Sequence, residues 1–391
     1  MKQKIIAFLL VFCTFPAFAE FKTKAKSAFL IDYDSGAEIV AKAADELMPP
    51  SSMLKLMTLA VLFDAVKSGE ISLNDRFLVG KNADYQNPIW YPASKICLSA
   101  GQDISVRDLI LGLIVLSGGD ASVVVAEKLA DTEEKFTDLM TAKARSIGMP
   151  LSTFGNASGL PNEKNLMTSR ELATLAYHII ADYPDLYPMF ATKRFEFGEY
   201  KTDWCRDWGK AHTVNYNKLL FIMSGADGLK TGHTDKGGYG MVASATSGGR
   251  RLIGVINGFH GKGHDALAAE MKSLLSHGFA TTMTKMFYHP GDDVVAVPVW
   301  YGQTKTVMGT VNKNFAITTN KETGLSGVSV LARYTDPIAA PVHKGDVLGE
   351  VVAVRDGITI ARSDLVAGTD VGRVRFFARA WRNIVVMLMG R

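Results

Sequence analysis

The feature that most constrains the fold of this 391-residue chain is a change of hydrophobic pattern at His289-Pro290-Gly291. Before this point, apolar residues recur at helical spacing in several segments, and strand-like segments lie near the start and around residue 240. After it, short apolar runs separated by glycine and proline predict strands alone. We therefore expect an α/β (α+β) domain over residues 20–290 and a small all-β domain over residues 291–370.

Apolar periodicity and turn residues predict the individual elements. A hairpin is expected where Ser247-Gly248-Gly249 separates two strand-like runs, and a capping box where Thr168 precedes Glu171 by three residues. The predicted helices cover residues 51–67, 105–116, 121–145, 168–180 and 265–284. The predicted strands cover residues 29–33, 38–41, 239–245, 251–258, 294–300, 306–311, 315–319, 328–334, 347–354 and 358–361.

The first 19 residues have the character of a secretory signal. Lys2 and Lys4 precede an apolar run over residues 5–15 that is too short to span a bilayer. Ala17-Phe18-Ala19 then provides a small-residue cleavage site, so the mature chain is expected to start at Glu20 and to be exported. The alternative is an uncleaved anchor.

The last segment, residues 371–391, has five arginines and no acidic residue. Apolar residues recur there at helical spacing, and Arg375, Arg379 and Arg382 fall on another face. This pattern predicts an amphipathic helix that lies on a membrane surface, because the segment is too short and too charged to span. A helix docked on the β domain is the alternative.

Charge and cysteine usage narrow the function classes. The formal net charge is +4, and two of the lysines lie in the expected signal, so no nucleic-acid partner is expected. Cys97 and Cys205 remain outside the signal, and in an oxidising compartment they either pair or stay as two unpaired apolar side chains. His260 and His264 lie among glycines rather than on one helical face. We therefore expect neither a metal nor a cofactor.

The first motif with catalytic potential is Ser52-Met53-Leu54-Lys55. Positions i and i+3 of a helix share a face, so Lys55 can reach the oxygen of Ser52. A serine hydroxyl needs a base to become a nucleophile, and a buried lysine can be neutral enough to act as one. Taken alone, the spacing is more typical of an N-cap serine and a solvated lysine.

Two further motifs follow along the chain. Lys230-Thr231-Gly232 opens the predicted hairpin, where a strand edge can pair with an extended peptide and glycine permits close approach. Ser117-Gly118-Gly119-Asp120 follows an apolar helix, and Ser117 could relay a proton between the two lysines. The alternatives are a solvated edge lysine beside a turn glycine, and a plain helix-terminating turn.

The order and spacing of the three motifs resemble those of the low-molecular-mass penicillin-binding proteins that act as D-alanyl-D-alanine carboxypeptidases. The resemblance covers residues 25–285 and, less specifically, the β domain and the C-terminal segment. It implies a β-lactamase/transpeptidase-like domain in which helices flank an antiparallel sheet. Further matching stretches are Asp32-Tyr33-Asp34-Ser35-Gly36, Asn156-Ala157-Ser158-Gly159-Leu160-Pro161 and Asp227-Gly228-Leu229-Lys230-Thr231-Gly232-His233-Thr234.

The resemblance also implies roles. Ser52 attacks the carbonyl between two terminal D-alanines, and Lys55 takes its proton. Ser117 and Lys230 pass a proton to the leaving D-alanine. The backbone N–H groups of Ser52 and His233 form the oxyanion hole. The expected partners are peptidoglycan stem peptides ending in D-Ala-D-Ala and β-lactam antibiotics that acylate Ser52. The C-terminal amphipathic helix adds the outer surface of the inner membrane as a partner, and together with the signal segment it places the protein in the periplasm.

Three positions depart from the family pattern. Gly119 stands where the family usually has an asparagine. Tyr216 and His264 stand where it often has arginines, so recognition of a carboxylate is expected to depend on Lys230, Thr231 and His264. The departures leave open a weak carboxypeptidase or a D,D-endopeptidase that prefers cross-linked peptides. They are also consistent with a non-catalytic peptidoglycan- or penicillin-binding protein, and a β-lactamase would share the Ser52–Lys55 pair.

Overall fold

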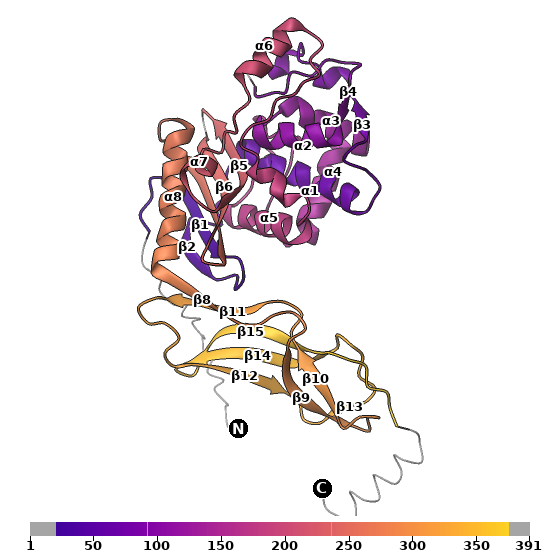
Figure 1. The fold of residues 1–391 in the computed structure, drawn as a ribbon, viewed down its shortest axis with the longest axis vertical. Coiled ribbons are helices and arrows are strands. Elements are labelled where there is room, and N and C mark those ends of the chain that lie inside the picture. The colour runs from indigo at the N-terminus through magenta and orange to yellow at the C-terminus, as the bar shows by residue number, and fades with distance from the viewer. Residues whose placement is uncertain (1–20, 92, 236, 375–391) are drawn as a thin grey trace, which may run out of the picture. The chain divides into compact units, whose positions relative to one another are not determined.

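The computed structural model describes residues 21–91, 93–235 and 237–374. Within this part of the chain there are two compact units, one ending at Ala280 and the other beginning at Thr281. The expected signal segment, residues 1–19, lies outside the described residues. The mixed α/β class predicted from the sequence is confirmed (Figure 1).

The first unit contains a five-stranded antiparallel sheet with the order β2-β1-β7-β6-β5. Its strands are β1 (Ser27–Asp32), β2 (Glu38–Lys42), β5 (Ala226–Thr234), β6 (Gly238–Ser247) and β7 (Arg250–Phe259). The predicted hairpin is confirmed between β6 and β7, where Gly248 and Gly249 both have positive φ, as a tight hairpin turn requires. β5 lies at the edge of the sheet, as expected for the strand with Lys230-Thr231-Gly232.

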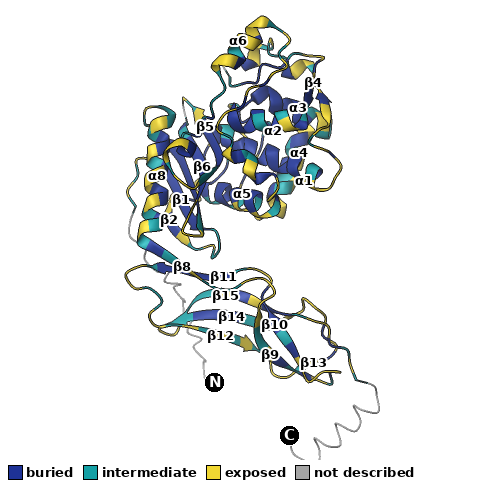
Figure 2. Ribbon diagram, viewed as in Figure 1, coloured by how far each residue is buried: buried dark blue, intermediate teal, exposed yellow. Residues whose placement is uncertain are grey.

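Helices cover both faces of this sheet (Figure 1). Alternate residues of a strand point to opposite faces, so Phe29 and Ile31 join the core shared with the helical region, whereas Leu30 faces α8 (Gly263–Thr281). A Cβ at Gly278 would lie 2.6 Å from a methyl carbon of Leu30, so only glycine allows α8 to come this close. Figure 2 shows both the sheet and the first helices as largely buried.

The helical region lies between β2 and β5 in the sequence. Its longer helices are α1 (Lys55–Lys67), α2 (Val106–Val115), α3 (Gly119–Ala130), α4 (Glu133–Ser146) and α5 (Ser169–Asp182). Its shorter elements are η1 (Ser51–Leu54), η2 (Lys81–Ala83), η3 (Pro88–Trp90), η4 (Tyr187–Ala191), α6 (Asp203–Ala211), α7 (Leu219–Ile222) and the strands β3 (Arg76–Leu78) and β4 (Asp103–Ser105). α1 is buried along most of its length and is the centre of this region.

Two local predictions need correction. The single helix expected over residues 121–145 is wrong, because Asp131 has φ 63° and Thr132 caps a new helix by accepting a hydrogen bond from the N–H of Lys135. The Thr168 cap of α5 is confirmed, but the capping box is half formed. The carboxylate of Glu171 instead accepts from the N–H of Leu151 and the hydroxyl of Ser152.

The second unit is all-β, as predicted. A six-stranded sheet has the order β12-β14-β15-β10-β9-β13, and β8 and β11 form a separate pair. The strands are β8 (Thr282–Tyr288), β9 (Asp293–Trp300), β10 (Thr306–Thr310), β11 (Phe315–Asn320), β12 (Val328–Tyr334), β13 (Ile338–Ala339), β14 (Val347–Arg355) and β15 (Ile358–Ala367). The helix expected to run to residue 284 ends at Thr281, because the next residues pair with β11. The unit therefore begins ten residues before the expected boundary.

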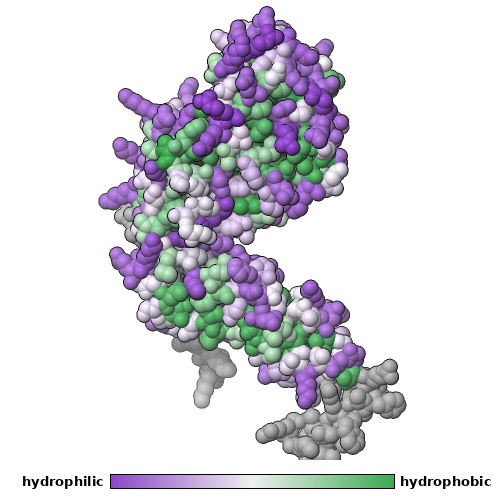
Figure 3. Space-filling view, in the orientation of Figure 1, coloured by the Kyte–Doolittle hydropathy of each residue, from purple (hydrophilic) through white to green (hydrophobic). Residues whose placement is uncertain are grey.

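The end of the described chain differs from the expected start of a helix at residue 371. Val371 exchanges two backbone hydrogen bonds with Val342, and Arg373 bridges to Gly302, so this stretch is extended. The remainder of the expected amphipathic helix, residues 375–391, lies outside the described residues. No helix in the described part of the chain has the length and apolar character needed to cross a membrane. Apolar side chains reach the surface of the second unit (Figure 3), among them Leu331 and Val347.

Candidate active site

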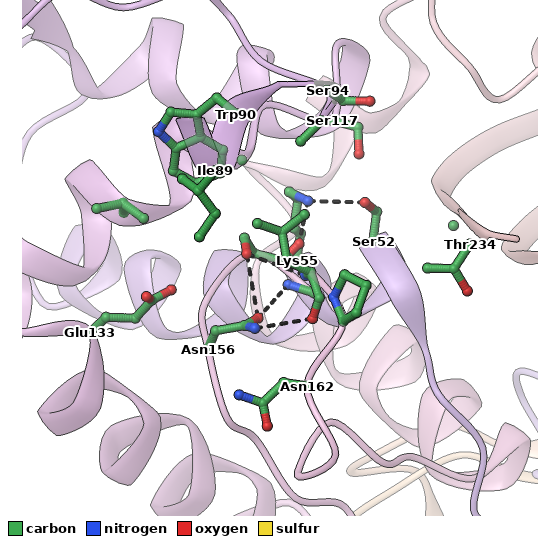
Figure 4. Close-up of a pocket in the computed structure, with 18 of the residues that line it drawn as sticks. Ser52, Lys55, Ile89, Trp90, Ser94, Ser117, Glu133, Asn156, Asn162 and Thr234 are labelled. Carbon is green, nitrogen blue, oxygen red and sulfur yellow. Dashed lines mark hydrogen bonds between the residues drawn. The ribbon is translucent and has the colours of Figure 1, made fainter. Parts of the chain in front are cut away.

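Ser52 and Lys55 lie at the start of the buried helix of the first unit (Figure 4). Ser52 is in η1, a turn of 3-10 helix, and Lys55 is the first residue of α1. In a 3-10 turn, residues three apart are almost eclipsed, so Lys55 Nζ lies 3.0 Å from Ser52 Oγ. The same ammonium group donates to the carbonyl of Ser158. Lys55 is only 3% exposed, so its amine can meet the serine without competition from bulk water.

Burial determines the charge state of Lys55. Desolvation lowers its pKa to about 7, and the nearby carboxylate of Asp120 only partly opposes this shift. A base with a pKa near the working pH can both accept and return a proton. Lys55 therefore has the geometry and the pKa that activation of Ser52 requires.

Ser117 and Lys230 form a second serine–lysine pair. Ser117 lies in the short connection between α2 and α3, where its φ of 57° turns the backbone. Lys230 Nζ donates to Ser117 Oγ at 3.0 Å and to the carbonyl of Thr231 at 3.0 Å. Burial and the charge of Lys55 lower the pKa of Lys230 well below its usual value. The structure thus brings together the two pairs that the sequence motifs predicted.

Strand β5 approaches η1 closely at Gly232. A Cβ there would lie 2.8 Å from the carbonyl oxygen of Pro50 and 3.1 Å from the backbone nitrogen of Ser52. Only glycine fits at this distance. The contact brings the N–H of Ser52 near the strand on which His233 follows Gly232. The two expected oxyanion donors therefore lie on adjacent segments.

A cleft of about 990 Å³ opens in front of Ser52. It is lined by the predicted residues Ser52, Lys55, Ser117, Gly119, Thr231, Gly232, His233 and His264, and by further side chains that include Trp90, Glu133, Asn156, Tyr216 and Thr234. Lys230 lies behind Ser117 and is 1% exposed. The expected site residues therefore line one cleft, except Lys230, which is connected to it through Ser117.

The space beside Gly119 is occupied by the side chain of Trp90. A Cβ at this residue would lie 2.5 Å from the six-membered ring of Trp90 and 3.3 Å from the carbonyl of Ser94. Trp90 is fully buried, and its indole N–H donates to the carbonyl of Asn82 at 2.9 Å. The asparagine usual in the family therefore has no room here, because the indole occupies the space beside the backbone.

Asn156 and Ser158 contribute to the site through their loop, a role that the sequence analysis did not assign. Ser158 supplies the carbonyl that holds Lys55, and the next carbonyl back, from Ala157, accepts from Thr58 Oγ1. Asn156 closes the loop, accepting from the N–H of Gly159 and donating to the carbonyl of Leu160 (Figure 4). The sequence signal that could have indicated this role is the stretch Asn156-Ala157-Ser158-Gly159-Leu160-Pro161, which matches the family pattern.

Asp120 is a second residue whose role was missed. Its carboxylate is fully buried and accepts hydrogen bonds from the N–H groups of Ile96, Cys97, Leu98 and Ala121. We call residues 93–98 the strap. Asp120 fixes the strap to the start of α3, directly beside Ser117. Its position in Ser117-Gly118-Gly119-Asp120 was a sequence signal for a role at the site, but the sequence did not identify the backbone N–H groups that it binds.

The pairing of Cys97 with Cys205, which the sequence left open, is present in the structure. The disulfide joins residues 108 apart and attaches the strap to α6. Aromatic contacts support the same attachment. Lys95 Nζ in the strap lies 4.2 Å from the ring centre of Trp208, and the ring of Tyr85, which precedes the strap in the sequence, stacks on that of Trp204 at 5.5 Å. α6 therefore stabilises the wall of the cleft from behind.

His264 lies in the first turn of α8 and faces other rings in the cleft wall. Its ring centre lies 5.2 Å from that of Tyr216 and 5.3 Å from that of Tyr239. Burial is the largest cause that lowers its pKa to about 4, followed by the charges of Lys230, His233 and Lys218. At neutral pH His264 is therefore an uncharged imidazole.

Comparisons with known proteins agree with this geometry. Residues 15–260 match the family model described as D-alanyl-D-alanine carboxypeptidase, and residues 283–373 match the C-terminal domain of penicillin-binding protein 5. D-alanyl-D-alanine carboxypeptidase DacA of Haemophilus influenzae is 34% identical over 94% of this chain and 90% of its own length. DacA of Escherichia coli K12 is 31% identical over 93% of this chain and 87% of its own.

A solved structure extends the similarity to three dimensions. The crystal structure of penicillin binding protein 5 from Haemophilus influenzae superposes with a TM-score of 0.81 and 32% identity, covering 91% of this chain and all of that one. Sequence and fold thus agree over both units. The chain belongs to the D-alanyl-D-alanine carboxypeptidase family of penicillin-binding serine hydrolases.

Proposed function

We propose that this protein removes the terminal D-alanine from peptidoglycan stem peptides through an acyl-enzyme on Ser52, and that penicillins acylate the same residue. The observation that carries the proposal is the contact between Lys55 Nζ and Ser52 Oγ at 3.0 Å inside a cleft that also holds Ser117 and the edge strand β5. An extended peptide can pair with such an edge, which presents its scissile carbonyl to Ser52.

The proton path follows the two serine–lysine pairs. Lys55 takes the proton of Ser52 as its oxygen attacks the carbonyl carbon, and the carbonyl oxygen becomes negative. The N–H groups of Ser52 and His233 stabilise that oxygen, and each such donor typically lowers the activation barrier by about 3–4 kcal/mol. Lys230 and Ser117 deliver a proton to the leaving amine as the C–N bond breaks. A water molecule then adds to the ester, and Ser52 recovers its proton.

The substrate test is release of free D-alanine from a pentapeptide ending in D-Ala-D-Ala. We expect measurable release by the full chain, with a companion assay on a cross-linked peptide dimer. A preference for the dimer would assign the D,D-endopeptidase activity, which the absence of arginine at Tyr216 and His264 leaves open. Rapid release from the pentapeptide alone would exclude it, and turnover of neither peptide would contradict the proposed function.

The pKa of Lys55 predicts the pH dependence of acylation. Because burial lowers this pKa to about 7, the neutral base predominates above pH 7 and disappears below it. The second-order rate constant for acylation by a labelled penicillin should fall about tenfold per pH unit below 7 and level off above it. Lys55→Arg, which stays charged throughout, should be slow at every pH. A flat profile for the native chain between pH 5.5 and 8.5 would contradict the assignment.

A β-lactamase and a non-catalytic binding protein receive less support. A β-lactamase needs a carboxylate that activates the deacylating water. Glu163, which follows the stretch Asn156-Ala157-Ser158-Gly159-Leu160-Pro161 in the sequence, is exposed and outside the cleft lining. A non-catalytic binding protein has no need for a lysine whose pKa is held near 7 against a serine oxygen. We therefore favour the hydrolase.

We also propose that the protein works in the periplasm on the outer face of the inner membrane. The expected signal segment and the disulfide between Cys97 and Cys205 support export, because disulfides persist in oxidising compartments. The basic residues of 371–391 support attachment to anionic lipid. Membrane fractionation of the full chain against a chain ending at residue 374 tests the attachment. An unchanged distribution would contradict it.

A further inference from the structure

The loop that supplies a carbonyl to Lys55 is held from α1. We call residues 155–160 the base loop. Thr58 Oγ1 donates to the carbonyl of Ala157 at 2.7 Å, and Lys55 donates to the next carbonyl, that of Ser158. Thr58 and Lys55 are three residues apart on α1 and therefore share a face of that helix. Two successive carbonyls of the base loop are thus bound from α1.

The same loop is held from α4 by Glu133. Its side chain extends into the cleft towards the base loop (Figure 4), and a carboxylate oxygen accepts from the N–H of Ala157 at 2.8 Å. Ala157 is fully buried, and a buried N–H without a partner is costly. Both backbone polar groups of Ala157 are therefore bound, one by each helix, directly before the residue whose carbonyl holds Lys55.

Stabilisation of α4 alone does not explain the position of this carboxylate. Glu133 and Glu134 both lie in the first turn of α4, where the helix dipole favours an acidic side chain. Glu134 is exposed, so it interacts with the dipole without losing water. Glu133 is partly buried, and burial is the largest cause that raises its pKa, whereas the hydrogen bond from Ala157 lowers it. The contact with the base loop therefore compensates a cost that a carboxylate serving only the dipole would not meet.

We propose that Glu133 is a positioning residue for the base of the reaction: through Ala157 it holds the carbonyl of Ser158 against Lys55 Nζ, and so keeps this amine beside Ser52 and away from bulk water. This inference rests on the proposed function, because it concerns the group that activates Ser52. Glu133 acts through the base loop and transfers no proton itself.

Loss of the Glu133 carboxylate should change the charge state of Lys55. Water from the cleft can replace the carboxylate at the N–H of Ala157, but the base loop then has no bond to α4 at this residue, and water gains access to the amine. Desolvation is the largest cause that lowers the pKa of Lys55, so this pKa should rise towards its ordinary value. The charged groups that act on Lys55 from other elements, Asp120 of α3 and Lys230 of β5, are unchanged by the substitution.

The test is the pH profile of acylation by a labelled penicillin between pH 5.5 and 9, measured on the full chain and on Glu133→Ala. We expect the midpoint of the variant to lie about one pH unit higher, so that its rate constant at pH 6.5 is about tenfold below that of the native chain. The deficit should shrink above pH 8, where the amine is neutral in both proteins.

Two matched variants separate position from charge. Glu133→Gln keeps an oxygen that accepts from Ala157 but removes the charge. It should retain the native midpoint and stay within about threefold of the native rate. Glu134→Gln removes the neighbouring charge on an exposed position outside the cleft lining and should leave the profile unchanged.

Thr58→Val tests the base loop from the other helix. Valine has nearly the same shape as threonine but cannot donate to the carbonyl of Ala157. The midpoint should again move upward. This variant also serves if circular dichroism shows that Glu133→Ala does not fold.

The outcomes distinguish the inference from the function on which it rests. A deficit of Glu133→Ala that is equal at every pH, or a native profile in both folded variants, would overturn the positioning role. A midpoint that moves as far in Glu133→Gln as in Glu133→Ala would show instead that the charge of Glu133 acts directly on Lys55, which also overturns it. Absence of acylation in the native chain would remove the proposed function itself.

Discussion

Ser52→Ala should abolish covalent labelling by penicillin and reduce peptide hydrolysis by about 10⁴-fold or more, because it removes the oxygen on which the acyl-enzyme is proposed to form. Mass spectrometry of the intact protein after penicillin treatment measures the adduct directly. One added mass on the native chain and none on the variant is the expected result. An adduct on Ser52→Ala would contradict the assignment.

Ser51 provides a matched control, because it is the neighbouring serine in the same turn. Its hydroxyl lies 3.4 Å from Thr234 Oγ1, whereas Lys55 donates to Ser52. Ser51→Ala should therefore still acquire the penicillin adduct on Ser52. The pair of variants separates the effect of losing the nucleophile from that of disturbing η1.

The sequence predicted the parts of the site that depend on local geometry. The Ser52–Lys55 contact follows from a spacing of three residues, and the edge position of Lys230 follows from the hairpin beside it. Six strands of the second unit (β9 to β12, β14 and β15) were also predictable, because glycine and proline mark their ends, whereas β8 and β13 were not predicted. These features arise within about ten residues of chain, the range over which hydrophobic period and turn residues carry information.

Features that depend on distant contacts were not predictable. Cys97 meets Cys205 across 108 residues, and Trp90 fills the space beside Gly119 from a different segment. α6 escaped notice because it is short and highly charged on its exposed side. β3 and β4 have three residues each, too few to show a period. In each case the partner lies far along the chain, and single-sequence patterns do not identify partners.

Asp120→Asn should cost about 3 kcal/mol or more of folding free energy and slow acylation of Ser52. Each carboxylate oxygen of Asp120 accepts two backbone N–H groups: Ile96 and Ala121 on Oδ1, Cys97 and Leu98 on Oδ2. An asparagine places an NH₂ group against two of these donors in either orientation, which leaves them buried and unpaired. Thermal unfolding followed by circular dichroism should show a fall in Tm of roughly 6–12 °C.

The loss of activity follows from the location of the strap. Asp120 binds the N–H groups of residues 96–98 in the strap, and it follows Ser117 by only three residues. If the variant releases these N–H groups, the cleft wall formed by the strap and the Ser117–Lys230 pair should both shift. The penicillin acylation rate should fall while the final adduct remains on Ser52. Asp138→Asn, on an exposed position of α4, is the matched control and should change neither Tm nor rate. A loss below about 1 kcal/mol for Asp120→Asn would show that the strap is held by the disulfide and the aromatic contacts of α6 instead.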